Sequence, residues 1–303
     1  MPRFTMKKSF FVFLFLVLIA GAVVLCVSLV PPRPAPDAST IHIVASFYPV
    51  AEFARQAGGS LVDVTTVTPA GVEPHEYEPT SQQVAAMYDA DVFLYNGGGI
   101  DAWAERIALE LEGRGVATVN MSKVVGASVS DPHFWLDPVF AQAEVTLIKN
   151  AVMSVDPTHA ADYTQNAEAY NAVLAALFAD YTSGLAVCDN RTVVTSHDAF
   201  AYLAARYHFD TVAIAGLSPE EEPSAGRIAE IAELAKEKNI GYIFFETLVS
   251  PRLSQTVANE IGASTLVFNP LEGLTDDDIA AGKSYVSVMR ENLSNLRTAM
   301  VCR

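Results

Sequence analysis

Residues 158–185 read THAADYTQNAEAYNAVLAALFADYTSGL, and this stretch divides the chain into two similar halves. Its apolar side chains recur at the spacing of one helix face: Ala161, Tyr163, Ala167, Tyr170, Val173, Leu174, Leu177 and Tyr181. Asp156-Pro157, directly before it, is a helix-start signal. A helix of this length would extend about 40 Å at about 1.5 Å per residue, enough to run the length of a domain. The stretch therefore predicts one long helix joining two parts.

Short apolar, β-branched runs alternate with helical patterns on both sides of this stretch. Before it, strands are predicted at 41–47, 62–67, 91–95 and 117–120, and helices at 48–57, 80–89, 101–111 and 138–155. After it, strands are predicted at 192–195, 211–215, 240–245 and 265–268, and helices at 199–207, 226–239, 252–261 and 276–300. Such alternation implies parallel strands joined by right-handed crossovers.

The predicted fold class is therefore α/β, with two parallel-sheet βα lobes, a long rigid linking helix and a cleft between the lobes. The expected division is an N-terminal segment at 1–38, a first lobe at 39–157, the linking helix at 158–185 and a second lobe at 186–303. The triple glycine at 97–99 lacks the spacing of a dinucleotide-binding loop and is interpreted as a turn.

The composition of the chain argues against some classes of function. The chain has 303 residues, 51% of them hydrophobic and 18% charged, which is typical of a folded protein with a large core. Its formal net charge of −16 argues against binding nucleic acid or anionic lipid, because both need basic surfaces.

The N-terminus has the pattern of an export segment. Arg3, Lys7 and Lys8 precede residues 10–30, which carry no charged side chain and are long enough to span a bilayer. We expect a retained anchor, or cleavage near 35–39, more than lipidation of Cys26, and a proline-rich spacer at 30–37. The rest of the chain is then extracytoplasmic. Export would also suit a surface adhesin, although nothing else in the sequence supports one.

Two cysteines remain in the expected exported part, Cys188 and Cys302. An even pair outside the cytoplasm favours a disulfide, and two buried free thiols are the alternative.

Three histidines lie at or just beyond the ends of predicted strands. His75 lies in GVEPHEYEPT (71–80), where two prolines stiffen the loop. His133 lies in SDPHFWLDP (130–138), and His197 follows the strand at 192–195. Ligands bind at the carboxyl ends of strands in open α/β sheets, so we expect these side chains to meet in the cleft. His42, His159 and His208 are interpreted as ordinary strand or surface residues.

Three imidazoles with one carboxylate suit a tetrahedral divalent cation, Zn²⁺ more than Mn²⁺, which prefers more oxygen. From position alone, the carboxylate is either Glu246 or Glu272. Glu246 could instead orient a histidine or cap a strand, and Asp198 could cap a helix or support the site. Glu73, Glu76 and Glu78 are expected to surround or guide the cation without binding it.

These residues lie in five motifs that resemble the metal-binding solute-binding proteins of zinc and manganese ABC importers, across about residues 40–303. The motifs are PHEYEPT (74–80), DPHFWLDP (131–138), TSHDAFAYL (195–203), FFE (244–246) and NPLEGL (269–274). The resemblance implies two lobes bridged by one rigid helix, with the metal buried between them. It also implies a monomer that passes the ion to a membrane permease and no enzymatic activity.

The resemblance implies the ligands His75, His133, His197 and Glu272. Some members use an aspartate near the position of Asn269, whereas similar zinc-binding members have a glutamate where Glu272 stands. Many zinc members carry a histidine-rich loop, but residues 76–132 contain no histidine. The positions of Cys188 and Cys302 fit a bridge found in part of the family.

A zinc hydrolase using the same histidines is the alternative from another class. It would need an open coordination position and a nearby base, and the sequence has no His-Glu-x-x-His helix.

Overall fold

The computed structural model describes residues 40–126 and 130–303. The predicted export segment and its spacer lie outside these ranges. Within them, no helix combines the length and the apolar character that crossing a membrane requires.

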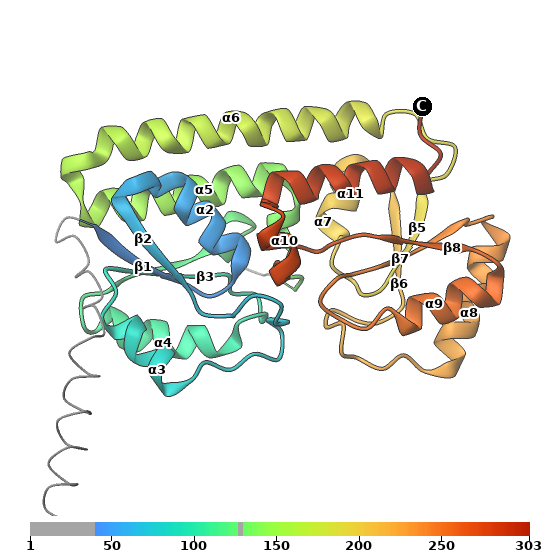
Figure 1. Ribbon diagram of the computed structural model, residues 1–303, viewed down its shortest axis with the longest axis horizontal. Coiled ribbons are helices and arrows are strands. Elements are labelled where there is room, and N and C mark those ends of the chain that lie inside the picture. The colour runs from blue at the N-terminus through green and yellow to red at the C-terminus, as the bar shows by residue number, and fades with distance from the viewer. Residues whose placement is uncertain (1–39, 127–129) are drawn as a thin grey trace, which may run out of the picture. The chain divides into compact units, whose positions relative to one another are not determined.

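The first half contains a parallel four-stranded sheet. Its strands are β1 (Ile41–Ala45), β2 (Val62–Thr66), β3 (Val92–Tyr95) and β4 (Ala117–Asn120), in the order β2-β1-β3-β4. The central strand β1 buries side chains on both faces, as parallel sheets covered by helices do. Ile43 packs toward α2 (Tyr48–Gly58) and α5 (Pro138–Val155), and Val44 packs toward α3 (Ser81–Tyr88) and α4 (Ala102–Glu112). Figure 1 shows these two helix layers on opposite sides of the sheet.

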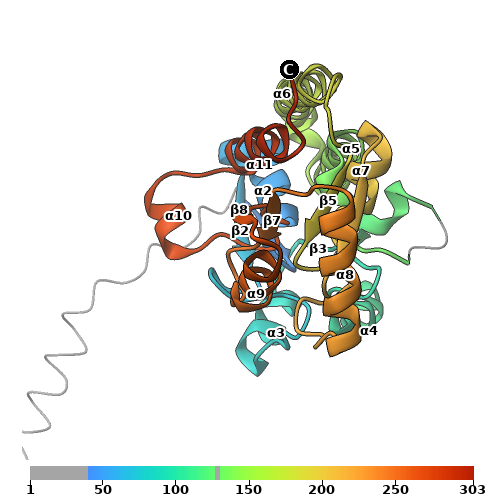
Figure 2. The ribbon, with the colours of Figure 1, turned by 90° about the vertical axis from the view of Figure 1, so that its right-hand side faces the viewer.

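The second half repeats this arrangement. Its strands are β5 (Thr192–Thr195), β6 (Asp210–Ala213), β7 (Tyr242–Phe245) and β8 (Ser264–Val267), all parallel, in the order β6-β5-β7-β8. One face packs against α8 (Ala225–Glu237) and α9 (Arg252–Ile261), and the other against α7 (Ala201–Tyr207) and α11 (Tyr285–Ala299) (Figure 2). The two matching sheets confirm the predicted fold class.

The long helix predicted at 158–185 is present as α6 (Ala160–Gly184), preceded by a 3₁₀ turn at Pro157–His159. It packs against α2 and α5 of the first half and against α11 of the second (Figure 1). Most of the predicted apolar stripe is buried, but Ala161 and Val173 face solvent. The Tyr181 hydroxyl donates to the carbonyl of Met289 at 2.7 Å, which fastens α6 to α11.

The prediction of one final helix at 276–300 is wrong. Two helices occupy this stretch, α10 (Asp276–Ala280) and α11 (Tyr285–Ala299). Gly282 adopts φ 69° between them, a conformation that favours glycine and ends a helix. Ser284 then caps α11 through a reciprocal pair of hydrogen bonds with Ser287. The chain between the two helices therefore changes direction.

Cys188 and Cys302 form a disulfide, as predicted from the two cysteines of the expected exported part. The bond joins the segment after α6 to the C-terminal end of the chain, beyond α11. Arg303 and Asp189 form an exposed ion pair next to it at 3.0 Å.

Candidate metal centre

His75 lies in the loop between β2 and α3. Its backbone N–H donates to the Glu73 carboxylate at 3.0 Å, across the buried Pro74. The next turn is closed by the Tyr77 amide, which donates to the carbonyl of Pro74 at 3.2 Å. The His75 side chain is 9% exposed, whereas the other three side chains of the centre are fully buried. His75 is therefore the one side chain of the group with contact to solvent.

His133 lies in the segment that leads into α5. One oxygen of Asp131 accepts both the His133 backbone N–H at 2.9 Å and the ring Nδ1–H at 2.7 Å. Because an ionised carboxylate can only accept, Nδ1 carries the proton and Nε2 is left with its lone pair. Asp131 thus fixes both the orientation and the tautomer of His133.

His197 follows β5 directly. Its carbonyl accepts a hydrogen bond from the Thr195 hydroxyl at 2.9 Å, and its Nδ1 donates to Glu246 at 2.9 Å. Glu246 is the first residue after β7, the strand that pairs with β5. The neighbouring strand end therefore supplies the carboxylate that leaves Nε2 of His197 free for an ion.

Glu272 lies in the loop after β8. Asn269 turns this loop, because its side-chain oxygen accepts the Leu271 N–H at 2.7 Å. Leu271 has a φ of 59°, a strained conformation for a leucine, and the buried Asn292 holds Asn269 through both its backbone groups. These bonds direct the Glu272 side chain toward the histidines, and Asn269 itself lies outside the group.

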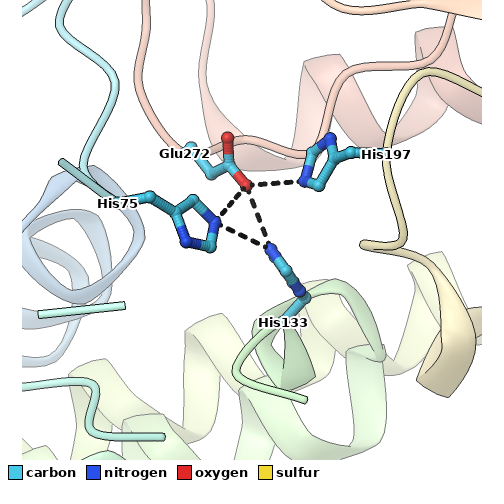
Figure 3. Close-up of side chains that lie close together, drawn as sticks. All are labelled: His75, His133, His197 and Glu272. Carbon is cyan, nitrogen blue, oxygen red and sulfur yellow. Dashed lines mark hydrogen bonds and ion pairs between the residues drawn. The ribbon is translucent and has the colours of Figure 1, made fainter. Parts of the chain in front are cut away.

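Figure 3 shows the four predicted side chains converging from four separate loops. The Glu272 Oε1 atom lies 3.4 Å from Nε2 of His75, 3.1 Å from Nε2 of His133 and 3.2 Å from Nε2 of His197. The Nε2 atoms of His75 and His133 are 3.2 Å apart. Four donors around one ion at bonds of about 2.0 Å would lie about 3.3 Å from one another in a tetrahedron. These four separations are close to that value, and all four atoms lie within 4.8 Å of one another, close enough to surround one cation.

The charges of the group are strongly coupled. Burial alone would raise the pKa of Glu272, but His197, His133 and His75 outweigh it and hold that pKa well below its ordinary value. Burial also opposes protonation of His197, yet Glu272 and Glu246 keep its pKa well above its ordinary value. The pKa of His133 is raised in the same way, with Asp131 and Glu272 outweighing burial. Glu272 is thus held as an anion, and any proton on Nε2 of His133 or His197 would have to leave before a cation could bind there.

The acidic residues around His75 differ in role. Burial and the nearby Glu272 carboxylate raise the pKa of Glu73 to about 8, so Glu73 carries little charge at neutral pH. Its carboxylate accepts the backbone N–H of His75. Glu76 and Glu78 are exposed on the same loop, where guiding a cation stays a prediction.

The structure brings together His75, His133, His197 and Glu272 as predicted. Glu246 faces the far side of His197, which supports its interpretation as an orienting residue. Asp198 does not cap the following helix, because α7 begins at Ala201 with Phe200 at its cap. Asp131 was missed, although the pattern of an acid, a proline and a histidine occurs twice, at 73–75 and at 131–133. That repeat was the available signal.

Comparisons with known proteins show the family of the chain. Residues 43–299 match the family described as ZnuA, zinc-uptake complex component A, periplasmic. The zinc-binding lipoprotein AdcA of Streptococcus pneumoniae is 39% identical over 276 residues, which are 85% of this chain and 55% of AdcA. This chain therefore spans about half the length of that relative. The high-affinity zinc uptake system protein ZnuA of Bacillus subtilis is 36% identical over 283 residues, 87% of this chain and 88% of that protein.

A solved structure gives the same grouping. The Zn(II)-bound ZnuA-like domain of Streptococcus pneumoniae AdcA has a TM-score of 0.77 and 39% sequence identity, covering 86% of this chain and 99% of that domain. With a family match over nearly all of the described residues, this chain belongs to the ZnuA family of zinc-uptake component A proteins.

Proposed function

We propose that this protein captures Zn²⁺ outside the cytoplasm and delivers it to the membrane permease of an ABC importer. The observation that carries the proposal is the set of three imidazole nitrogens and one carboxylate oxygen that lie within 4.8 Å of one another. His75, His133, His197 and Glu272 are the proposed ligands. Membership of the zinc-uptake family supports both the ion and the permease partner.

The donor set favours zinc over manganese. Three nitrogens and one oxygen suit a tetrahedral Zn²⁺ site, whereas Mn²⁺ prefers more oxygen ligands and a higher coordination number. The Nδ1 partners Asp131 and Glu246 make the two imidazoles better donors to a borderline-soft ion. Manganese binding is the competing proposal.

The proposed organisation is that of a monomeric carrier. The two lobes, 39–157 and 186–303, would hold the ion between them, with His75 and His133 from the first lobe and His197 and Glu272 from the second. Size-exclusion chromatography with light scattering tests the monomer, and a mass of twice the chain would contradict it.

Capture and transfer also suit the site better than hydrolysis. Four protein ligands fill a tetrahedral coordination sphere, while a hydrolytic zinc site keeps one position for water. Catalysis would require Glu272 to leave the ion.

Zinc affinity of single variants tests the ligand set. We expect His133→Ala and His197→Ala to lose tight zinc binding, measured by competition with a chromogenic chelator, while circular dichroism stays that of the folded protein. His159→Ala is the matched control, since this partly exposed histidine pairs with Asp156 away from the centre. Unchanged zinc affinity in either site variant would contradict the assignment.

Metal identity needs a direct measurement. Protein purified without added metal should contain zinc by elemental analysis, and Zn²⁺ should displace Mn²⁺ in a competition titration. Preferential retention of Mn²⁺ at equal free concentrations would favour the manganese proposal.

A further inference from the structure

The turn after β3 contains a buried polar cluster that the ligand set does not explain. Asn96 is completely buried and Asp101 is 3% exposed. The Asp101 carboxylate accepts the backbone N–H of Asn96 at 2.7 Å and that of Gly97 at 2.8 Å. Burial raises the pKa of Asp101 to about 6, so the carboxylate is mostly ionised at pH 7 and can accept both bonds. Asp101 thereby fixes the backbone from which the Asn96 side chain projects.

The Asn96 side chain reaches the segment that carries His133. Its Nδ2 group donates to the carbonyls of Gly97 and Pro132, both at 3.0 Å. Both partners are carbonyl oxygens, which can only accept, so the amide orientation is fixed by its surroundings. The Pro132 carbonyl belongs to the peptide bond that joins Pro132 to His133. A rotation of that peptide would move the His133 backbone directly.

A residue of the second half also holds the segment that leads to His133. The Tyr202 hydroxyl of α7 donates to the carbonyl of Asp131 at 3.1 Å. Asn96 therefore supplies a hydrogen bond from the first sheet, and Tyr202 one from the second half, to two successive carbonyls. Asp131, whose carboxylate orients the His133 ring, carries the first of these two carbonyls.

The glycine turn makes this geometry possible. Gly97 has a φ of 74°, and a Cβ atom on it would lie 2.5 Å from the side-chain oxygen of Asn120. A larger residue would be strained and would displace the turn that presents Asn96. The triple glycine was interpreted from the sequence only as a turn. It directly follows Asn96, whose side chain contacts the segment that carries His133.

We propose that Asn96 is a positioning residue for the metal centre, which holds the Pro132–His133 peptide so that Nε2 of His133 meets the ion at the correct distance. This inference rests on the proposed function of zinc capture. Asn96 acts through His133 and does not touch the ion. Partners that orient a metal ligand typically change affinity about 10–100-fold when they are removed.

The test compares two asparagine variants. Asn96→Ser removes the amide donor to Pro132, and Asn295→Ser removes a similar donor, from Asn295 of α11 to the carbonyl of Val267 at 2.8 Å. We expect zinc affinity to fall about tenfold or more in Asn96→Ser and to stay within twofold of the parent in Asn295→Ser. Competition with a chelator gives the affinities, and thermal unfolding of the metal-free proteins gives the stability change.

A spectroscopic measurement separates positioning from general loss of stability. Co²⁺ bound in place of zinc reports ligand geometry through its visible absorption bands, and we expect these bands to change in Asn96→Ser but not in Asn295→Ser. Zinc affinity within twofold of the parent and an unchanged Co²⁺ spectrum in Asn96→Ser would overturn the inference, even if the metal-free variant unfolds at a lower temperature.

Two further variants keep the result interpretable. If Asn96→Ser does not fold, Asp101→Asn weakens the same turn with a smaller change, and a parental affinity in that variant would overturn the inference. His133→Ala tests the proposed function separately. Loss of binding in His133→Ala with normal binding in Asn96→Ser leaves zinc capture intact and rejects only the role of Asn96.

Discussion

The buried rings of His133 and His197 each donate a hydrogen bond from Nδ1 to a carboxylate, that of Asp131 or that of Glu246. Variants of these two carboxylates test whether they support metal binding. Asp131→Asn and Glu246→Gln keep an acceptor oxygen but remove the negative charge beside Nδ1. We expect zinc affinity to fall about 10–100-fold in each, because the imidazoles become weaker donors. Chelator competition measures the effect, and Glu168→Gln, at an exposed position of α6, is the control. Parental affinity in both variants would contradict the proposed orienting role.

Glu144 of α5 gives a second prediction at this scale. Its side chain is completely buried, and neither carboxylate oxygen has a protein partner within the described residues. Burial raises the pKa of Glu144 well above its ordinary value. A carboxyl whose pKa is higher in the folded state contributes stability below its unfolded pKa, and that contribution is lost as the pH rises through the folded pKa.

Glu144→Gln should therefore remove part of the loss of stability that accompanies rising pH. We expect its free energy of unfolding to fall less than that of the parent as the pH rises above the ordinary carboxyl pKa, measured by urea denaturation at several pH values. Glu168→Gln on the exposed face of α6 is the matched control and should follow the parent. Parallel pH profiles for Glu144→Gln and the parent would show that Glu144 is not a buried acid of this kind.

The sequence could predict that the four proposed ligands lie together, for a physical reason. Parallel strands bring their carboxyl ends to one edge, so histidines placed after strands could be expected to meet. Position alone could not separate Glu272 from Glu246, since both follow strands of the same sheet, and the family resemblance decided between them. The role of Asn96 depends on a contact between residues 36 positions apart, which no local pattern encodes.

At the scale of elements, the pattern of apolar residues predicted whether a segment is a helix or a strand better than it predicted where the segment begins and ends. All eight strands form where short apolar runs predicted them, although β6 and β8 each begin one residue earlier than expected. The final helix was predicted as one element at 276–300, but the chain leaves the helical conformation at 281–284. The stop there comes from Gly282 in a left-handed conformation and from the Ser284 cap, two local signals that outweigh periodicity.

The disulfide is an element-scale feature with a testable energy. The bond between Cys188 and Cys302 closes a loop with a sequence separation of 114 residues. Closing a loop of this size restricts the unfolded chain and stabilises the fold by about 2–4 kcal/mol. We expect the double variant Cys188→Ser with Cys302→Ser to lose about that much free energy of unfolding in urea while keeping its zinc affinity.

Reduction of the parent protein provides the control for this prediction. Parent protein treated with dithiothreitol should unfold at the same urea concentration as the double variant, because both lack the same constraint. A double variant as stable as the oxidised parent would show that the bond does not stabilise the fold.

At the scale of the whole described molecule, the two halves share one hydrophobic core. The largest buried cluster contains side chains of both sheets together with those of α2, α5, α6 and α11. Polar contacts cross the same interface: Arg206 pairs with the buried Asp137 at 2.7 Å, and the Trp135 ring donates to the carbonyl of Pro270 at 2.8 Å. The sequence predicted two lobes but not this continuous core, because packing between distant segments leaves no periodic trace in either one.

The coupled charges of the metal centre give the last prediction, the pH dependence of zinc binding. The pKa values of His133 and His197 are raised in the metal-free protein, yet both rings must be neutral to bind the ion. A raised histidine pKa contributes stability below the unfolded pKa, and this contribution is lost as the pH rises through the folded pKa. Metal-free protein therefore loses part of its stability with rising pH, while the zinc complex becomes easier to form.

Both effects act in the same direction, so the increase in unfolding temperature caused by zinc should be larger at pH 8 than at pH 6. Apparent zinc affinity should weaken as the pH falls, by up to about tenfold per pH unit for each proton displaced. Thermal unfolding of EDTA-treated protein with and without zinc measures the first effect, and chelator competition at each pH measures the second. His197→Ala should show little zinc-dependent shift at either pH. A zinc-dependent shift in the parent that is equal at both pH values would mean that the imidazoles are already neutral before the ion arrives.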